Sequence, residues 1–258
     1  MPSTNATYVY CIVSSRQPLS TTRTPAGPPG TREVRALEVR PKRYAVISDA
    51  PLDHFGERSL ANHLSDLDWV SRAAVAHEAV IASFMPQSDA VVPMKLFTLF
   101  TNDARALEEL RAGWTRVERV IRRLAKRDEW GVRLVFDESR APADDSAAAV
   151  ESGRGYLLAK RRQQATAAAR TANMRKIAGD VVKALRPLAS DTRQRTITAP
   201  PETESRSRML LDAAFLVPRG KAARFRAAVA RQARKITPAG FALQVTGPWP
   251  PYSFVDRA

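Results

Sequence analysis

The sequence predicts an α+β protein built from two α+β domains, residues 1–130 and 131–258, and three observations support this fold class. Short β-rich apolar runs alternate with segments whose apolar residues recur every three or four positions, so the chain contains both strands and helices. The strand–helix series starts twice, with a junction near residues 127–140. After the junction the order is strand, long helix, strand, helix, strand, which is typical of helices packed on one face of a mixed sheet.

The first domain begins with a buried strand, because Thr7–Ser14 (TYVYCIVS) is apolar and rich in β-forming residues. Residues 15–33 are rich in Pro, Gly, Ser and Thr and predict a loop. The elements expected after this loop are two short strands at Ala36–Arg40 and Arg43–Asp49, a helix at Ser65–Met85, a strand at Ala90–Phe100 bent at Pro93, and a helix from Asn102 or Asp103 to about Arg127. Both helices are predicted by their apolar spacing, and Pro86 ends the first of them.

The second domain begins with a strand at Trp130–Asp137, in which Val132, Leu134 and Phe136 alternate with other side chains. Residues 138–152 and 190–207 are polar and have no apolar period, so both are expected to be loops. The remaining elements are a long alanine-rich helix from Tyr156 to about Leu188, a strand at Met209–Val217, a helix from Pro218 to about Lys235, and a strand at Phe241–Thr246.

The positive charge of the chain is concentrated in its second part. The whole sequence has 41 Lys and Arg and 26 Asp and Glu, and beyond residue 145 there are 21 basic residues and only 7 acidic ones. This asymmetry predicts one region that contacts an anionic partner or an acidic protein face. The candidate contact residues lie on the long helix: Lys160, Arg161, Arg162, Arg175 and Lys176. A basic helix face that contacts only solvent is the alternative interpretation.

The composition excludes several classes of protein and of site. A single cysteine, Cys11, excludes an internal disulfide and a cysteine-based zinc cluster, and three histidines make a multi-histidine metal site unsupported. No apolar run approaches the roughly 18 residues that span a bilayer, and the first residues do not form a signal peptide. We therefore expect a soluble cytoplasmic protein that does not cross a membrane.

Two segments begin like motifs of nucleotide-binding proteins or enzymes but lack the residues that the chemistry needs. Residues 27–31 (GPPGT) start like a phosphate-binding loop, yet Glu33 occupies the position of the phosphate-binding lysine. His77 and Glu78 lie on a helix as in zinc peptidases, yet Ile81 occupies the position of the second histidine. No serine lies in a G-x-S-x-G turn, and no spacing pairs two carboxylates. The sequence therefore predicts no catalysis, no cofactor, no metal ion and no small-molecule substrate.

The C-terminal segment GPWPPYSF (residues 247–254) combines three prolines with three aromatic rings. Proline fixes φ and excludes helix, so Trp249, Tyr252 and Phe254 stand on a stiff extended chain. We expect these rings to hold the end of the chain in the core, with Trp249 largely buried. The alternative is an exposed aromatic ledge for a partner, with Trp249 and Tyr252 as the contact residues.

Four segments, in this order along the chain, resemble one family. They are AHEAV at 76–80 on the helix opened by Trp69, VVPMKLFTLF at 91–100, EWGV at 129–132, and GPWPPYSF at 247–254. With the strands at 8–10 and 210–217, they make the chain resemble the gas vesicle GvpF/GvpL family over residues 7–255. Members of that family commonly have Arg, Phe and Gly where this chain has Lys95, Leu96 and Phe97.

The resemblance implies two α+β domains, the second a modified ferredoxin-like sandwich. It also implies a non-enzymatic minor component or assembly factor of gas vesicles, cytoplasmic or on the vesicle, that binds the major shell protein and other accessory Gvp proteins. A soluble adaptor suits a very hydrophobic shell protein, which must be kept from aggregating before assembly. The alternative function is nucleic-acid binding by the basic C-terminal region, although the few aromatic residues there serve base stacking poorly.

Overall fold

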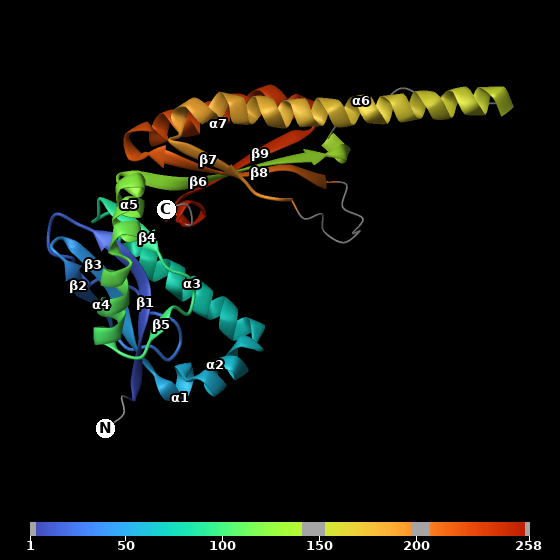
Figure 1. Ribbon diagram of the computed structural model, residues 1–258. Coiled ribbons are helices and arrows are strands. Elements are labelled where there is room, and N and C mark those ends of the chain that lie inside the picture. Colours follow the sequence, from blue (N-terminus) through green and yellow to red (C-terminus); the bar gives the residue numbers. More distant parts are fainter. Residues whose placement is uncertain (1–3, 141–152, 198–206, 256–258) are drawn as a thin grey trace. The chain divides into compact units, whose positions relative to one another are not determined.

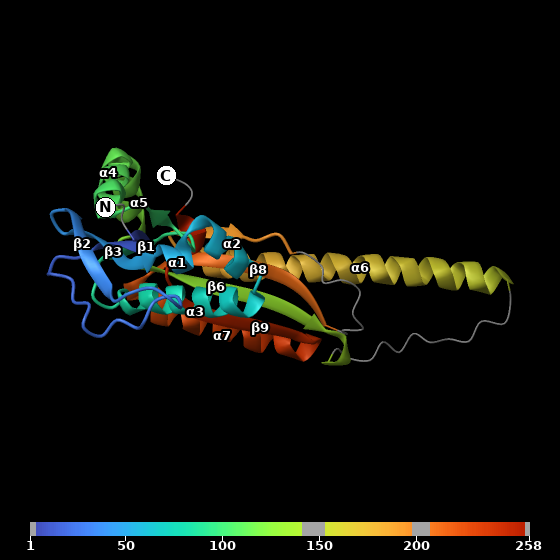
Figure 2. The ribbon, with the colours of Figure 1, turned by 90° about the horizontal axis from the view of Figure 1, so that it is seen from below.

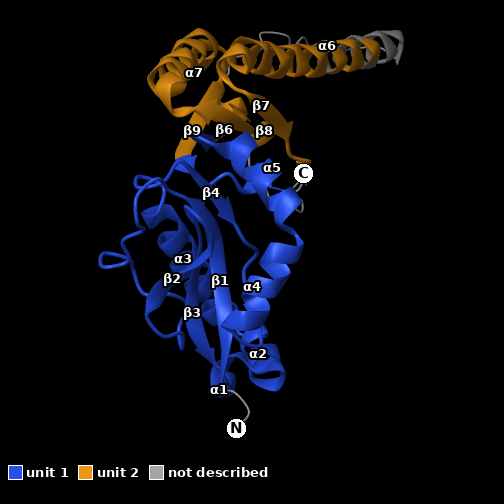
Figure 3. Ribbon diagram, turned by 60° about the vertical axis from the view of Figure 1, so that its left-hand side comes forward, with its two compact units in different colours: residues 1–129, 248–258 blue, residues 130–247 orange. Residues whose placement is uncertain are grey.

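The computed structural model describes residues 4–140, 153–197 and 207–255, and within them only the backbone of residues 153–160, 162, 163 and 167. The chain divides into two compact units (Figure 3). Residues 1–129 with 248–258 form the first unit, and residues 130–247 form the second. Each unit contains helices and a sheet, so the predicted α+β class is confirmed. We propose that the two units are the two domains, with residues 248–258 belonging to the first.

The first unit is organised around a sheet whose central strand, β1, is buried along nearly its whole length. Its strands are β1 (Asn5–Ser14), β2 (Val34–Arg40), β3 (Arg43–Pro51), β4 (Ala90–Pro93) and β5 (Leu99–Phe100). The order is β2-β3-β1-β4, and β5 also pairs with β1. All of these pairs are antiparallel. Burial of β1 on both faces explains why it reads as one continuous apolar run.

Helices cover both faces of this sheet (Figures 1 and 3). They are α1 (Leu52–Phe55), α2 (Glu57–Leu64), α3 (Leu67–Ser83), α4 (Asp103–Ala112) and α5 (Trp114–Leu124). Successive side chains of a strand point to opposite faces. Thr7 donates a hydrogen bond to Asp103 of α4, whereas the neighbouring Tyr8 contacts His77 of α3. The two helices therefore lie on opposite faces of β1.

The strand predicted at 90–100 is wrong in one respect, because the structure divides it into β4 and β5. Both pieces pair with β1, but residues 94–98 loop out between them. Backbone hydrogen bonds from Met94 to Tyr10 and from Val9 to Thr98 hold the two ends of this loop, each at 2.9 Å. Phe97 within it has φ of 61°, in the region that favours glycine. Glycine would adopt this conformation without the strain that a side chain brings.

The single helix predicted from 102 to 127 is also wrong, because Gly113 separates it into α4 and α5. Glycine is a poor helix former, and the two helices contact different strands: α4 packs near β1, β2 and β5, and α5 packs near β4. The short helices α1 and α2 were not predicted, since neither has an apolar stripe of useful length.

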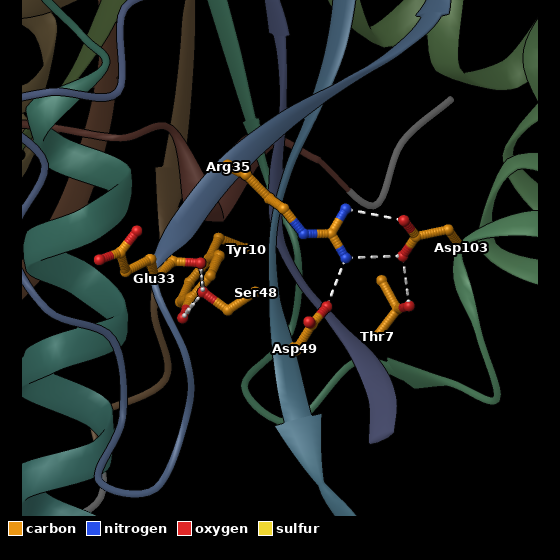
Figure 4. Close-up of polar contacts among 7 residues, drawn as sticks. All are labelled: Thr7, Tyr10, Glu33, Arg35, Ser48, Asp49 and Asp103. Carbon is orange, nitrogen blue, oxygen red and sulfur yellow. Dashed lines mark hydrogen bonds and ion pairs between the residues drawn. The ribbon is translucent and has the colours of Figure 1, made fainter. Parts of the chain in front are cut away.

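A polar cluster ties β1, β2 and β3 to the start of α4 (Figure 4). Arg35 of β2 donates to both carboxylate oxygens of Asp103, at 2.7 and 3.0 Å, and also to Asp49 of β3. Thr7 of β1 donates to Asp103 as well, at 2.7 Å. The guanidinium of Arg35 holds the pKa of Asp103 below its usual value. Bidentate pairing of this kind fixes geometry as well as charge.

We expect Asp103→Asn to lower the free energy of unfolding by about 1–2 kcal/mol, because it weakens three hydrogen bonds that are partly screened by solvent. The measurement is urea denaturation at pH 7. Glu108→Gln is the control, because Glu108 forms a more exposed ion pair within α4, with Arg105, and its loss should cost below about 0.5 kcal/mol. Equal losses in the two variants would show that the Arg35 cluster adds nothing specific.

The second unit is a four-stranded sheet with two helices on one face (Figures 1 and 2). Its elements are β6 (Arg127–Asp137), α6 (Gly153–Leu185), β7 (Asp191–Gln194), β8 (Ser207–Pro218), α7 (Ala222–Ile236) and β9 (Phe241–Trp249), with β6 entering and β9 leaving the unit at 130 and 247. The sheet order is β7-β8-β6-β9. The chain order β-α-β-β-α-β is compatible with a ferredoxin-like sandwich.

The prediction of a loop at 190–207 is corrected by strand β7, whose four polar residues pair antiparallel with β8. The predicted loop at 138–152 starts with a short 3-10 helix at Glu138–Arg140, and its remaining residues lie outside the described part of the chain. Alternate residues of β6 and β8 and one stripe of each helix form the core. This core contains Trp130, Val132, Leu134, Phe136, Met174, Val181, Leu185, Leu211, Ala213, Phe215, Val217, Phe225, Val229 and Phe241.

Candidate partner-binding surfaces

The helical face of the second unit is strongly basic. Helices α6 and α7 together carry thirteen Lys and Arg residues and one acidic residue, Asp180. All five basic residues of α7 are exposed: Arg224, Arg226, Arg231, Arg234 and Lys235. Because α6 and α7 lie on the same face of the sheet, their charges add to one positive field rather than cancelling across the unit (Figure 1).

The five basic residues predicted as contacts all lie on α6. Arg161, Arg175 and Lys176 are exposed, whereas the side chains of Lys160 and Arg162 are outside the described part of the structure. The helix is packed on the sheet from Met174 onward, through Met174, Val181 and Leu185. Its preceding turns extend beyond the end of the sheet (Figures 1 and 2). Of the side chains described between 164 and 173, all are exposed except Thr171, so this part of α6 is open to a partner.

In the first unit, two of the four segments that carry the family resemblance, 76–80 and 91–100, meet beside β1. The imidazole of His77 on α3 lies between the hydroxyl of Tyr8, 2.9 Å from Nδ1, and the carbonyl of Met94, 3.3 Å from Nε2. A carbonyl only accepts, so Nε2 carries the proton, and Nδ1 accepts from Tyr8. The Tyr8 hydroxyl in turn accepts from the backbone N–H of Phe97 at 3.2 Å. This chain of hydrogen bonds joins the helix, β1 and the 94–98 loop.

Burial lowers the pKa of His77 to about 4, so the ring is neutral at pH 7. A neutral imidazole with both nitrogens occupied fits a structural role. Among residues 4–140, 153–197 and 207–255, no group of three His, Cys, Asp or Glu side chains could hold a metal ion.

The end of the chain is anchored by a buried carboxylate. Glu129 is 3% exposed, and it accepts from the backbone N–H and the hydroxyl of Ser253, at 2.8 and 2.7 Å. Phe254 is fully buried, and the guanidinium of Arg123 lies 6.0 Å from its ring centre. Glu129 of the first motif and Ser253 of the second therefore form one contact within the first unit.

The prediction that Trp249 is largely buried is wrong. Its side chain is 45% exposed, and Tyr252 is also exposed. Strand β9 continues through Pro248 to Trp249, so the segment turns into the core only afterwards, where Pro250 and Pro251 are buried. Phe254 takes the anchoring role that the sequence had suggested for the larger ring.

Tyr252 contacts α3 through Glu78. The hydroxyl of Tyr252 is hydrogen-bonded to the Glu78 carboxylate. Although part of the Tyr252 side chain is exposed, these two polar groups are partly buried, and this raises the pKa of both. Together with Ala74, His77, Val255 and residues 93–96, they line a pocket of about 360 Å³. The sequence analysis considered Glu78 only as part of a zinc motif and did not predict that it lines a surface pocket. The available signal was that the α3 face carrying Glu78 also holds Leu67, Ala74 and Val75, where a solvent-facing side should be polar.

The described helices include none that is long and apolar enough to cross a bilayer. The sequence matches, over residues 6–256, the model of the family described as gas vesicle synthesis protein GvpL/GvpF. It is 30% identical over 222 residues to gas vesicle protein L of Streptomyces sp. (strain CB03234), covering 83% of this chain and 80% of that protein. It is 26% identical over 264 residues to gas vesicle protein L2 of Halobacterium salinarum, covering 96% and 90%.

Two solved structures share the fold. The crystal structure of GvpF from Anabaena sp. PCC7120 superposes with a TM-score of 0.67 at 18% identity, covering 98% of this chain and 99% of that one. The crystal structure of GvpF from Microcystis aeruginosa gives a TM-score of 0.62 at 13% identity, covering 97% and 99%. At these identities the structures speak for the fold alone.

Proposed function

Because the chain belongs to the gas vesicle synthesis protein family GvpL/GvpF, we propose that it is a minor component or assembly factor of gas vesicles that catalyses nothing. Its partners are the hydrophobic major shell protein and other accessory Gvp proteins, and it acts in the cytoplasm and on the vesicle. The observation that carries this proposal is the family match over residues 6–256, nearly the whole chain. Relatives named gas vesicle proteins L and L2 support it.

The basic helical face of the second unit supports a partly electrostatic contact with an acidic protein surface. Arg161, Arg175 and Lys176 are exposed and project from a helix with a single carboxylate, Asp180. Exposed charges at the rim of an interface mainly set the association rate and the salt sensitivity. We therefore expect binding of the partner to weaken modestly as ionic strength rises.

The test is co-purification of the protein with each purified Gvp protein of its gene cluster at low and high salt. A variant with Lys160, Arg161, Arg162, Arg175 and Lys176 changed to Glu should recover at least fivefold less partner at low salt. The control carries five reversals on exposed arginines of the first unit and should bind as wild type does: Arg23, Arg32, Arg58, Arg116 and Arg119.

Equal recovery by wild type and the α6 variant at both salts would remove α6 from the interface. Failure of the wild type to bind any Gvp protein, together with normal vesicles in a deletion strain, would overturn the proposed function. Tight binding of DNA or RNA with a steep salt dependence would instead favour the nucleic-acid alternative, for which the same basic face is suited.

A further inference from the structure

The first unit has a mainly apolar surface pocket, to which the packing described so far assigns no role. It lies between α3, the 94–98 loop and the turn that follows β9, and its volume is about 360 Å³. Its walls are the side chains of Ala74, Pro93, Met94, Leu96 and Val255, joined by His77, Glu78, Lys95 and Tyr252. This volume is large enough to hold an aliphatic side chain.

One carboxylate oxygen in the pocket lacks a donor. Oε1 of Glu78 is buried and has no hydrogen-bond partner in the described part of the structure, while Tyr252 is bonded to the same carboxylate. The negative charge of Glu129 also acts on Glu78. A buried acceptor without a donor destabilises the fold, because the group has lost its hydrogen bonds to water. The pocket therefore contains an unpaired acceptor in a protein of net charge +15, and Lys95, the cation among the lining residues described, is exposed.

The outer face of α3 continues the apolar lining. Leu67 is 81% exposed and Val75 is 69% exposed. Positions 67, 71, 74, 75 and 78 fall on one side of the helix, because residues three and four apart are neighbours. The stripe from Leu67 to Glu78 extends for roughly 16 Å at 1.5 Å per residue, which matches about three turns of a second helix laid against it. Exposed apolar side chains next to a pocket mark an interaction site.

We propose that this pocket and the outer face of α3 bind an amphipathic helical segment of a protein partner, with an aliphatic side chain in the pocket and an Arg or Lys paired to Glu78. The cation supplies the donor that Oε1 lacks, and the apolar stripe gives the remaining contact area, as in other helix-in-groove complexes. The identity of the partner as a gas vesicle protein rests on the proposed function above.

The chemistry of the pocket can be tested without any partner protein. We would titrate the full chain with hexylguanidinium or hexanoate and follow the methyl NMR signals of Met94, Leu96 and Val255. Hexylguanidinium should bind saturably and at least fivefold more weakly to Glu78→Gln, whereas Glu38→Gln, an exposed carboxylate on β2, should leave binding unchanged. Equal binding of the two ions, or no effect of Glu78→Gln, would overturn the proposal.

The surface is tested with the purified Gvp proteins of the gene cluster. Leu67→Asp and Val75→Asp should each lower partner recovery at least fivefold, and Leu52→Asp, an exposed leucine on α1, should not. If wild type binds a Gvp protein and both α3 variants bind it equally well, the surface is excluded and the proposed function stands. If wild type binds none, the proposed function fails, and the hexylguanidinium titration still shows whether the pocket binds a cation with an aliphatic chain through Glu78. If instead Val75→Asp converts a dimer to a monomer in sedimentation, the occupant is a second copy and the proposal is wrong.

Discussion

Replacing Phe254 by alanine will lower the free energy of unfolding by about 3–5 kcal/mol, whereas Trp249→Ala will cost less than about 1 kcal/mol. Phe254 is fully buried, so its removal leaves a cavity in the first unit, but nearly half of the Trp249 side chain is already in contact with solvent. The measurement is urea denaturation at 25 °C, followed by far-ultraviolet circular dichroism.

The comparison between the Phe254 and Trp249 variants decides which ring anchors this segment. Both lie within the same six residues of the chain, so any general effect of altering the C-terminus appears in both variants. Equal losses, or a larger loss at Trp249, would show that the end of the chain is held by a different side chain from the one identified here. If Trp249→Ala leaves stability unchanged but weakens binding of a Gvp protein, the exposed ring serves as the partner ledge.

Lowering the pH from 7 to 4 will remove about 3 kcal/mol of stability through His77. The pKa of His77 is about 4 in the folded protein, compared with 6.5 in the unfolded chain. Between these values the unfolded state binds a proton that the folded state does not, so stability falls as pH falls. The physical cause is burial of the ring, whose Nδ1 must stay unprotonated to accept from Tyr8.

The measurement is the free energy of unfolding at pH 7, 6, 5 and 4 for wild type, His77→Gln and His54→Gln. His77→Gln is less stable at pH 7 but should lose about 3 kcal/mol less on acidification, while His54→Gln should follow wild type because His54 is exposed. Titration of the carboxylates, including Glu78, is common to all three proteins and cancels in the differences. Parallel curves for His77→Gln and wild type would contradict the assigned pKa.

Much of the fold could be predicted because the strongest elements are encoded locally. The apolar run of β1 and the spacing of α3 require no knowledge of distant residues, and Asp66 caps α3 through hydrogen bonds to the backbone of Asp68 and Trp69. Strand β7 could not be predicted, because its four polar residues become a strand only when β8 pairs with them. Tertiary pairing decides such short segments.

The candidate sites divide in the same way. The basic character of α6 follows from composition, so those residues could be named in advance. The environment of His77 could not, since Tyr8, its hydrogen-bond partner, lies 69 residues away in the sequence. The environment of Glu78 could not be predicted either, because Tyr252 and the 94–98 loop, which line the same pocket, are distant from it in the sequence. The burial of Trp249 was predicted wrongly, because the size of an aromatic side chain does not determine which of the three rings packs in the core.

The assignment of residues 248–258 to the first unit has a consequence for how the protein is made. The N-terminus of a chain leaves the ribosome first, and domains generally fold as they emerge. Here the two hydrogen bonds from Ser253 to Glu129, and the burial of Phe254, become available only after residues 130–247 have been synthesised. The first unit is therefore completed only after the whole second unit has been synthesised. We expect nascent chains stalled before residue 247 to hold an unfinished first unit, and a fragment ending at residue 129 to be less stable than the complete unit because it lacks Ser253 and Phe254.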